Sequence, residues 1–254
     1  MMVESSVLTS LENGVFGITL NRPAKRNALS SEMVELLHQA LERADLDSGA
    51  RVVLIRGAGK DFCAGLDLDE LLASADKSED ENAASALRLG TLFQGLRRLP
   101  KPVIGLVMGR ALAGGAGLAT ACDLVIASQG AQLGYPEIQR GFVPAMVTTL
   151  LRRLTGEKTA LDLILTGRVL TADEALAAGL VTRVVPEAEL EREGADMAAR
   201  LAASSSSALA LTKRLFYELD GKSLTEGIQL AARVNAVART TPDFRDALVR
   251  FLRR

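Results

Sequence analysis

Residues 103–127 read VIGLVMGRALAGGAGLATACDLVIA, with two apolar runs on either side of a glycine-rich segment. Val103–Val107 and Leu124–Ala127 are short, continuous apolar runs, a pattern typical of strands that are covered on both faces. Between them, Ala113–Gly117 predicts a glycine turn that enters a short helix at Leu118. A strand, a helix and a strand in succession predict parallel strands joined by a helical crossover.

The same alternation extends toward the N-terminus, whereas the C-terminal part is helical. The elements predicted before residue 103 are strands at 15–20 and 52–55 and amphipathic helices at about 31–44 and 83–99. After about residue 144 the strand signal fades, and the spacing predicts helices at 148–154, 156–165, 171–178, 190–203, 208–219 and 223–238. We therefore expect an α/β core over 1–195 and a helical C-terminal region over 196–254.

The composition is that of a globular protein rather than a disordered one. Of the 254 residues, 48% are apolar and 24% are charged. The 30 basic residues are balanced by 31 acidic ones, and this formal net charge of −1 argues against nucleic-acid binding through bulk charge. Two cysteines, Cys63 and Cys122, are too few for a disulfide framework and fit a reducing compartment.

Neither secretion nor membrane insertion is predicted. Residues 1–10 lack the basic and apolar regions of a secretory signal. The most apolar stretch, Val103–Ala127, is interrupted by Arg110 and Asp123, whereas a membrane span needs about 20 apolar residues. We therefore expect a cytoplasmic protein that binds neither a membrane nor nucleic acid.

The scarcity of histidine excludes much catalytic chemistry. The one histidine, His38, lies on the helix predicted at about 31–44, where we expect a surface residue. The sequence shows no cluster of zinc ligands and no suitably placed histidine for a nucleophilic triad. Proton transfer must therefore fall to carboxylates, and electrophilic stabilisation to backbone amides.

Two segments that follow predicted strands combine glycine with small residues. They are Asp61–Leu68 (DFCAGLDL) and Gly109–Gly117 (GRALAGGAG). A phosphate-binding loop and a dinucleotide fingerprint are weak interpretations, because no Ser or Thr follows Lys60 and Thr120 replaces the third glycine. Turns and close helix–strand packing are the simple alternative. The other interpretation is that both segments bring backbone close to a ligand.

An ordered set of short motifs runs from about residue 10 to residue 254. The motifs are Arg22-Pro23 with Asn27-Ala28-Leu29, Phe62–Asp67, Lys101–Ile104, Ala113–Gly115 with Cys122-Asp123, Leu133–Glu137, Gly141–Ala145, Leu165–Gly167 and Ala178–Val181. In its order and spacing, this set resembles the enoyl-CoA hydratase/isomerase (crotonase) superfamily. Within that superfamily, the motifs resemble those of a bacterial branch of enoyl-CoA hydratase-like proteins.

The resemblance implies a crotonase-like α/β fold of repeated ββα units in two nearly perpendicular sheets, with C-terminal helices that build a homotrimer or a dimer of trimers. It also implies an acyl-CoA thioester substrate, as in fatty-acid β-oxidation, and no cofactor beyond the CoA of the substrate. In the family the thioester oxygen lies between two backbone N–H groups, and these positions fall on Leu66 and Gly114. Two such amides would stabilise an enolate oxygen.

The resemblance implies that Glu137, in the Pro136-Glu137 motif, transfers the proton. The family hydratases use two glutamates, and Gly117 stands here at the first position, where we expect a side chain to project toward the thioester. A lone glutamate with a raised pKa suits double-bond isomerisation, and it can also serve hydration. We expect a trans-2-enoyl-CoA hydratase. The alternatives are a 3,2-enoyl-CoA isomerase, another crotonase reaction and a non-catalytic scaffold.

The resemblance also implies residues that hold the substrate. Those expected to contact the substrate or its CoA are Arg26, Ala28, Ala64, Gly65, Asp67, Leu68, Gly117, Pro136, Phe251 and Arg254. Phe251 and Arg254 are expected to reach the adenine and phosphates of CoA bound by a neighbouring subunit. The depth of the acyl pocket is expected to depend on the packing of Leu66, Leu68, Leu71, Leu72, Phe93 and Met146.

Overall fold

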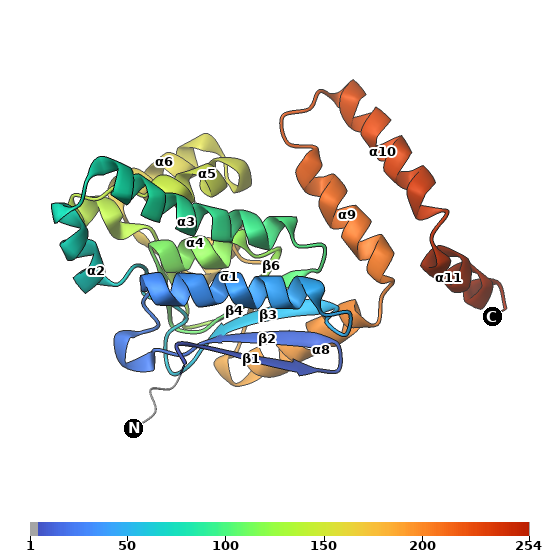
Figure 1. Cartoon of the computed structure of the whole chain (residues 1–254), viewed down its shortest axis with the longest axis horizontal. Coiled ribbons are helices and arrows are strands. Elements are labelled where there is room, and N and C mark those ends of the chain that lie inside the picture. The colour runs from blue at the N-terminus through green and yellow to red at the C-terminus, as the bar shows by residue number, and fades with distance from the viewer. Residues whose placement is uncertain (1–4, 254) are drawn as a thin grey trace.

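The computed structural model describes residues 5–253, and its strands form two sheets (Figure 1). The larger sheet has the strand order β1-β2-β3-β4-β6-β9. Its strands are β1 Val7–Glu12, β2 Val15–Leu20, β3 Val52–Gly57, β4 Val103–Val107, β6 Leu124–Ser128 and β9 Arg183–Val185. The smaller sheet has the order β5-β7-β8, with β5 Arg110–Leu112, β7 Gln132–Gly134 and β8 Val169–Thr171. The four predicted strands are confirmed as β2, β3, β4 and β6.

The larger sheet is parallel except at its edge, where β1 and β2 form an antiparallel hairpin. Asn13 and Gly14 make the two-residue turn, and both have positive φ, at 51° and 82°. Two successive positive φ angles are typical of the turns whose twist matches that of a hairpin. The predicted parallel arrangement is therefore confirmed for the interior of this sheet.

Five strands are missing from the sequence-based prediction. β5, β7, β8 and β9 have three residues each, too few for a two-residue alternation to stand out. β1 is an edge strand with one buried residue, so it lacks an apolar run. The expectation that strands end near residue 144 is wrong, because β8 and β9 complete the two sheets.

The nine predicted helices are confirmed, with shifts of up to four residues at their ends, and the structure adds helices at 68–73 and 242–252, for which no bounds were predicted. The helices are α1 Ser31–Leu46, α2 Leu68–Ala73, α3 Glu79–Arg98, α4 Gly114–Ala121, α5 Ala145–Leu154, α6 Glu157–Thr166, α7 Ala172–Ala177, α8 Leu190–Ala202, α9 Ser206–Glu218, α10 Leu224–Ala238 and α11 Pro242–Leu252. The largest shifts are in α3, which begins at Glu79 rather than residue 83, and in α4, which begins at Gly114 rather than Leu118. The glycines of α4 permit close packing, since a Cβ at Gly115 would lie 2.3 Å from the Cys63 carbonyl oxygen.

Apolar layers cover both faces of the larger sheet. α1, α3 and α4 lie on one face and α8 on the other (Figure 1). Leu190, Met197 and Ala198 of α8 pack against Leu54 and Leu106 of the sheet. Since α8 spans residue 195, the expected end of the core falls inside a helix that packs on the sheet.

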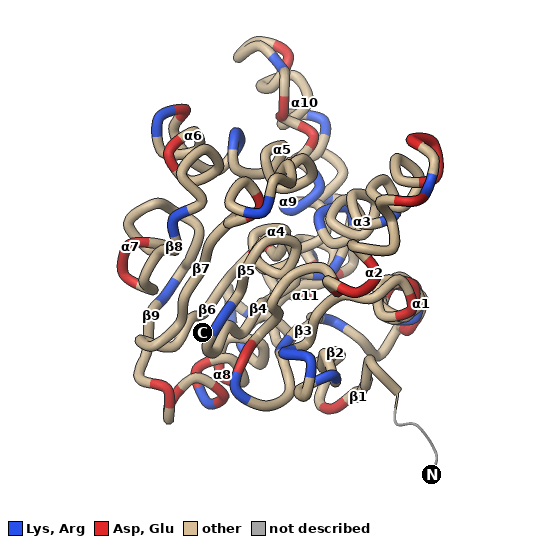
Figure 2. Tube along the Cα trace, turned by 90° about the vertical axis from the view of Figure 1, so that its left-hand side faces the viewer, with Lys and Arg blue, Asp and Glu red and all other residues tan. Residues whose placement is uncertain are grey.

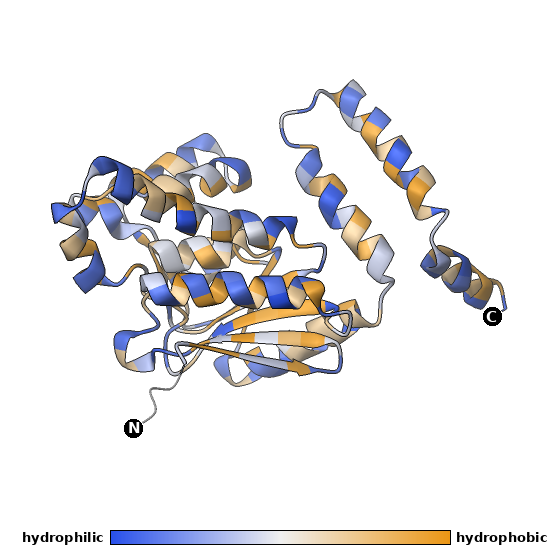
Figure 3. Ribbon diagram, viewed as in Figure 1, coloured by the Kyte–Doolittle hydropathy of each residue, from blue (hydrophilic) through white to orange (hydrophobic). Residues whose placement is uncertain are grey.

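The last three helices, α9 to α11, extend away from the rest of the chain (Figure 1). A buried ion pair anchors α9, with Lys213 Nζ 2.6 Å from Asp123 Oδ2. Tyr217 Oη donates a hydrogen bond to Asp123 Oδ1 (2.8 Å). Hydrophobic residues recur along these helices (Figure 3). Several of their large apolar side chains are exposed, among them Phe216, Leu224, Ile228, Val237, Phe251 and Leu252. Such surfaces are typical of interfaces, and the expected trimer stays a prediction for these helices.

Basic and acidic residues are interspersed along most of the chain trace (Figure 2). His38, expected at the surface, is half-buried between two helices. Its Nε2 lies 3.0 Å from the Arg88 carbonyl oxygen, so the ring links α1 to α3. Within residues 5–253, no helix combines the length and apolarity that crossing a membrane requires.

Candidate active site

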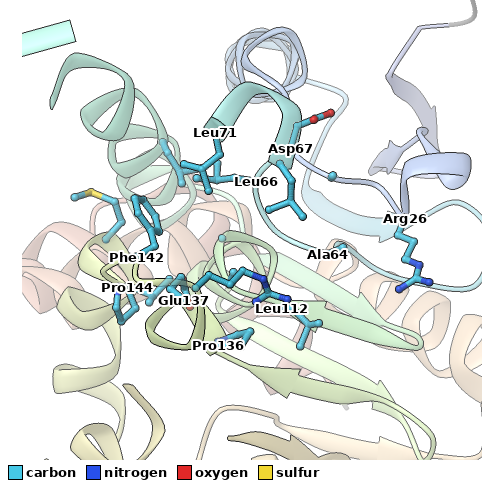
Figure 4. Close-up of a pocket in the computed structure, with 18 of the residues that line it drawn as sticks. Arg26, Ala64, Leu66, Asp67, Leu71, Leu112, Pro136, Glu137, Phe142 and Pro144 are labelled. Atoms are coloured by element: carbon cyan, nitrogen blue, oxygen red, sulfur yellow. The ribbon is translucent and has the colours of Figure 1, made fainter. Parts of the chain in front are cut away.

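A cavity of about 590 Å³ lies beside the first turn of α4 (Figure 4). Its walls come from η1 (Pro23–Lys25), residues 64–68, the beginning of α2, β5, η3 (Pro136–Arg140) and the beginning of α5. Figure 4 shows Arg26 and Ala64 toward one end of the cavity, and Leu71, Phe142 and Pro144 toward the other. The cavity therefore has one end with a cationic side chain and one apolar end.

The two glycine segments identified in the sequence run side by side at this cavity. Cys63 and Ala111 form an isolated parallel bridge, and Leu112 N donates to the Cys63 carbonyl oxygen (2.9 Å). Gly65 follows with a φ of 101°, a backbone conformation that only glycine adopts readily. A Cβ at Gly65 would lie 2.9 Å from Ala113 Cβ. The two segments touch because position 65 has no side chain.

This contact brings the backbone amides of Leu66 and Gly114 to one wall of the cavity. Both residues line the cavity, and a Cβ at Gly114 would lie 3.8 Å from Leu66 Cγ. The backbone of Leu29 bonds to the residues before and after Leu66. Its N–H donates to the Gly65 carbonyl oxygen (2.7 Å), and its carbonyl oxygen accepts from Asp67 N (2.9 Å). Among the residues that the structure describes, neither the Leu66 amide nor the Gly114 amide has a backbone acceptor. Both N–H groups are available to a ligand.

Glu137 lies across the cavity from Leu66, in the first turn of η3 (Figure 4). It is 8% exposed, and its Oε2 atom has no hydrogen-bond partner among residues 5–253. Burial raises the pKa of this carboxyl, and the Arg140 guanidinium acts in the opposite direction without cancelling the effect. A buried carboxyl with a raised pKa and an unpaired oxygen can both accept and donate a proton.

Asp67 has a structural partner at the cationic end of the cavity. Arg22 Nη2 lies 2.7 Å from Asp67 Oδ2, and Nη1 of the same guanidinium donates to the Ala28 carbonyl oxygen (2.5 Å). This hydrogen-bonded pair holds the pKa of the Asp67 carboxyl below its ordinary value. Asp67 also caps α2 by accepting from Asp69 N (3.1 Å). The pair therefore fixes the loop that carries the Leu66 amide.

Gly117 lies inside α4 rather than on the cavity wall. A Cβ at this position would lie 2.6 Å from Val147 Cγ1 and 2.7 Å from Phe93 Cζ. Because protein interiors are close-packed, both neighbours would have to move before any side chain could fit. A side chain at position 117 would therefore meet Phe93 and Val147 first, and the expectation that it projects toward the thioester stays a prediction.

The candidate catalytic groups at the cavity are the Glu137 carboxyl and backbone amides, and the cavity is also lined by the charged residues Lys25, Arg26, Asp67, Asp69, Arg110 and Arg140. Cys63 is nearby, but burial raises the pKa of its thiol to about 12, so the thiol stays protonated. Over the described range 5–253, no group of three or more His, Cys, Asp and Glu side chains is placed to hold a metal ion.

Comparison with known proteins agrees with these features. The enoyl-CoA hydratase/isomerase family model matches residues 10–254. The chain belongs to the enoyl-CoA hydratase/isomerase family. A provisionally named enoyl-CoA hydratase of Thermus thermophilus is 43% identical over 245 residues, which are 96% of this chain and 97% of that relative. The mitochondrial enoyl-CoA hydratase domain-containing protein 3 of Xenopus laevis is 34% identical, over 96% of this chain and 82% of that relative.

The fold of the family is also present in a solved structure. The crystal structure of an enoyl-CoA hydratase from Mycobacterium smegmatis matches this chain with a TM-score of 0.94 and 32% identity. The match covers 98% of this chain and 97% of that one. The predicted crotonase-like α/β fold is therefore confirmed.

Most residues that the family resemblance implies lie together at this cavity. Its walls contain Arg26, Ala28, Ala64, Leu66, Asp67, Leu68, Gly114, Pro136 and Glu137. Gly65 lies behind the wall, between Leu66 and the Ala113 side chain. Phe251 is exposed on α11, at the opposite end of the molecule from the α2 wall (Figure 1). Arg254 lies outside the described residues.

The apolar end differs in part from the expected set. Leu66, Leu68, Leu71 and Met146 line the cavity, whereas Leu72 is exposed and Phe93 is buried behind Val147 and Gly117. Among the lining residues that sequence reasoning missed are Leu89, Phe142, Val143, Pro144 and Val147. The motif at Gly141–Ala145 contains three of them, so the family pattern held a usable signal.

Proposed function

We propose that this chain hydrates trans-2-enoyl-CoA thioesters to 3-hydroxyacyl-CoA. The observation that carries the proposal is one buried carboxyl, Glu137, across a cavity from the two available amides of Leu66 and Gly114. Membership of the family supports a CoA thioester as the substrate. The names of the Thermus and Xenopus relatives support hydration as the reaction.

In this proposal the thioester oxygen accepts hydrogen bonds from the Leu66 and Gly114 amides. The acyl chain points toward the apolar end, near Leu71 and Phe142, and the CoA points toward Arg26. Amides fixed toward an oxygen that gains negative charge stabilise the transition state. Loss of one such donor lowers kcat by on the order of 10²–10³-fold.

Glu137 then takes part in two proton transfers, first from water to its carboxylate and then from its carboxyl to C2. As a carboxylate it accepts a proton from water while the water oxygen bonds to C3 of the enoyl group. The C2–C3 π electrons move toward the thioester and form an enolate, whose oxygen is held by the two amides. The Glu137 carboxyl returns the proton to C2, so that H and OH are added and the carboxylate is regenerated. No cofactor takes part in these steps.

Isomerisation of 3-enoyl-CoA is the second candidate, and the packing at Gly117 favours it. Phe93 and Val147 fill the space beside this glycine, so apolar side chains occupy the region next to the position where the family hydratases carry their first glutamate. A single carboxyl can move a proton from C2 to C4 without water. Excluding water from such a site would favour isomerisation over hydration.

The proposal extends to CoA recognition by a trimer. Phe251 does not line the cavity of its own chain, and its helix α11 lies across the molecule from α2 (Figure 1), so the proposal places its contact with CoA in a neighbouring subunit. The exposed apolar side chains of α9 to α11 provide a surface for such an assembly. Phe251 and Arg254 are the residues proposed to contact the adenine and phosphates.

Product analysis on two substrates tests the reaction. Wild-type protein is incubated with trans-2-butenoyl-CoA and, separately, with trans-3-hexenoyl-CoA, and products are separated by chromatography. We expect 3-hydroxybutanoyl-CoA from the first substrate. Efficient conversion of the 3-enoyl substrate, with no hydration of the 2-enoyl substrate, would make the isomerase proposal the correct one.

A further inference from the structure

Ala113, the residue before α4, has a backbone conformation that an L-amino acid rarely adopts. Its φ is 52° and its ψ is −125°. The other non-glycine residues with positive φ within residues 5–253 are Asn13, Arg26 and Asn27. Asparagine can stabilise such a backbone with its own side chain, whereas alanine has no polar side-chain group. Strain of this kind persists only where the surrounding structure enforces it.

Two hydrogen bonds hold Ala113 in this conformation. Its N–H donates to the Gly134 carbonyl oxygen at the end of β7 (2.8 Å). Its carbonyl oxygen accepts from Gly117 N in α4 (2.9 Å). The peptide groups on both sides of Ala113 are therefore fixed, one to the smaller sheet and one to the helix.

The second of these bonds sets the direction of the Gly114 amide. In a trans peptide the C=O of one residue and the N–H of the next point in opposite directions. Because the Ala113 carbonyl points along α4 toward Gly117, the Gly114 N–H points away from the helix. The Gly65–Leu66 segment lies on this side, since a Cβ at Gly65 would be 3.5 Å from Gly114 N.

The methyl group of Ala113 contributes a second constraint. It lies against Gly65, where an added Cβ would be only 2.9 Å away. A glycine at position 113 would adopt the same φ without strain, but it would lack this contact and would have many other conformations available. The backbone conformation alone therefore does not explain why residue 113 is alanine rather than glycine.

We propose that Ala113 is a positioning residue, whose strained backbone and methyl group hold the Gly114 N–H in line with the Leu66 N–H. This inference rests on the proposed function, because it assigns the two amides to the thioester oxygen. It makes a distinctive prediction: relaxing the strain should keep the fold intact and impair the site.

The test is Ala113→Gly, with Asn13→Gly in the β1–β2 turn as the matched control. Both replace a residue of positive φ by glycine, and Asn13 lies outside the cavity. We expect Ala113→Gly to have an unchanged or higher Tm and a kcat on 2-butenoyl-CoA at least tenfold lower, with a smaller change in KM. Asn13→Gly should keep wild-type kcat.

An infrared measurement makes the test independent of which reaction occurs. Butanoyl-CoA labelled with ¹³C at its thioester carbonyl is bound to wild type and to Ala113→Gly. Two aligned N–H donors lower the carbonyl stretching frequency, so we expect a smaller shift in the variant. The inference is overturned if the variant keeps the wild-type shift and kcat, or if kcat falls only together with Tm. Absence of turnover by wild type, with the infrared difference retained, would instead contradict the proposed reaction alone.

Discussion

Thr120 Oγ1 and Tyr135 Oη lie 2.7 Å apart, and both side chains are buried. Thr120 belongs to α4, which begins with Gly114, and Tyr135 immediately precedes Pro136 and Glu137. This hydrogen bond therefore connects the wall that carries an amide to the wall that carries the carboxyl. Burial raises the pKa of Tyr135, so its hydroxyl stays protonated and able to donate.

The Thr120–Tyr135 hydrogen bond should be visible in stability measurements. Thr120→Val leaves the Tyr135 hydroxyl buried without a partner, which lowers the free energy of unfolding by about 1–3 kcal/mol. Thr120→Val combined with Tyr135→Phe removes both hydroxyls, so its loss should be smaller than the sum of the two single losses. Urea unfolding of the four proteins measures this coupling. Additive single effects would show that the two hydroxyls do not stabilise each other.

The raised pKa of Glu137 predicts a pH-dependent gain in stability for Glu137→Gln. Burial raises the folded-state pKa above the unfolded one, so ionisation disfavours the folded state. The cost is absent below the unfolded pKa and grows as the pH rises through the folded pKa. Glu137→Gln should therefore match wild type near about pH 4 and be more stable at about pH 8.

Thermal unfolding of Glu137→Gln and wild type at both pH values checks this prediction. Glu42, exposed on α1, provides the control variant Glu42→Gln, which makes the same chemical change on the surface rather than at the cavity. A Glu137→Gln variant that loses stability relative to wild type as the pH rises would show that the carboxylate stabilises the fold.

The packing around Gly117 predicts that even a methyl group destabilises the protein there. Gly117→Ala would force Phe93 and Val147 apart, and overpacking of this kind costs about 1–3 kcal/mol. Gly156→Ala is the matched control, because a Cβ at Gly156 meets nothing within 4 Å. Denaturant unfolding compares the two variants. If the two substitutions change the free energy of unfolding equally, the side chains around Phe93 can move to accommodate a larger residue, and a carboxylate could be introduced at position 117.

Removal of residues 242–254 should weaken CoA binding more than it weakens the fold. α11 has no buried residue, and Asp243 attaches it to α9 by accepting from Ser205 Oγ (2.7 Å). We expect the truncated protein to unfold at nearly the wild-type temperature and to bind CoA at least tenfold more weakly by calorimetry. Light scattering should give the mass of a trimer or hexamer for wild type. A wild-type monomer at micromolar concentration would contradict the shared CoA site.

The fold was predictable from the sequence where apolar runs are long or ordered motifs are specific. The interior strands β3, β4 and β6 carry continuous apolar runs and β2 is rich in strand-forming residues, and the helical crossovers follow from the alternation of these strands with helices. β8 and β9 were not predictable, because three-residue strands are defined by the partners beside which they lie. Their pairing with β7 and β6 is a property of the folded chain.

The residues of the candidate site also divide into those that the sequence predicts and those that only the folded structure shows. Leu66, Gly114 and Glu137 were found from motif spacing, because the family pattern fixes their order along the chain. The fit of Phe93 against Gly117 and the strained conformation of Ala113 could not be found this way. Both depend on distances between residues that are far apart in sequence, and composition or periodicity carries no such information.

The most direct test of the proposed function is the turnover of trans-2-butenoyl-CoA by wild type, Glu137→Gln and Glu42→Gln at neutral pH. General acid–base catalysis contributes on the order of 10²–10⁴-fold. We predict that Glu137→Gln loses at least about 10²-fold in kcat while remaining folded, and that Glu42→Gln keeps wild-type kcat. A folded Glu137→Gln variant with nearly wild-type turnover would contradict the assignment of proton transfer to Glu137.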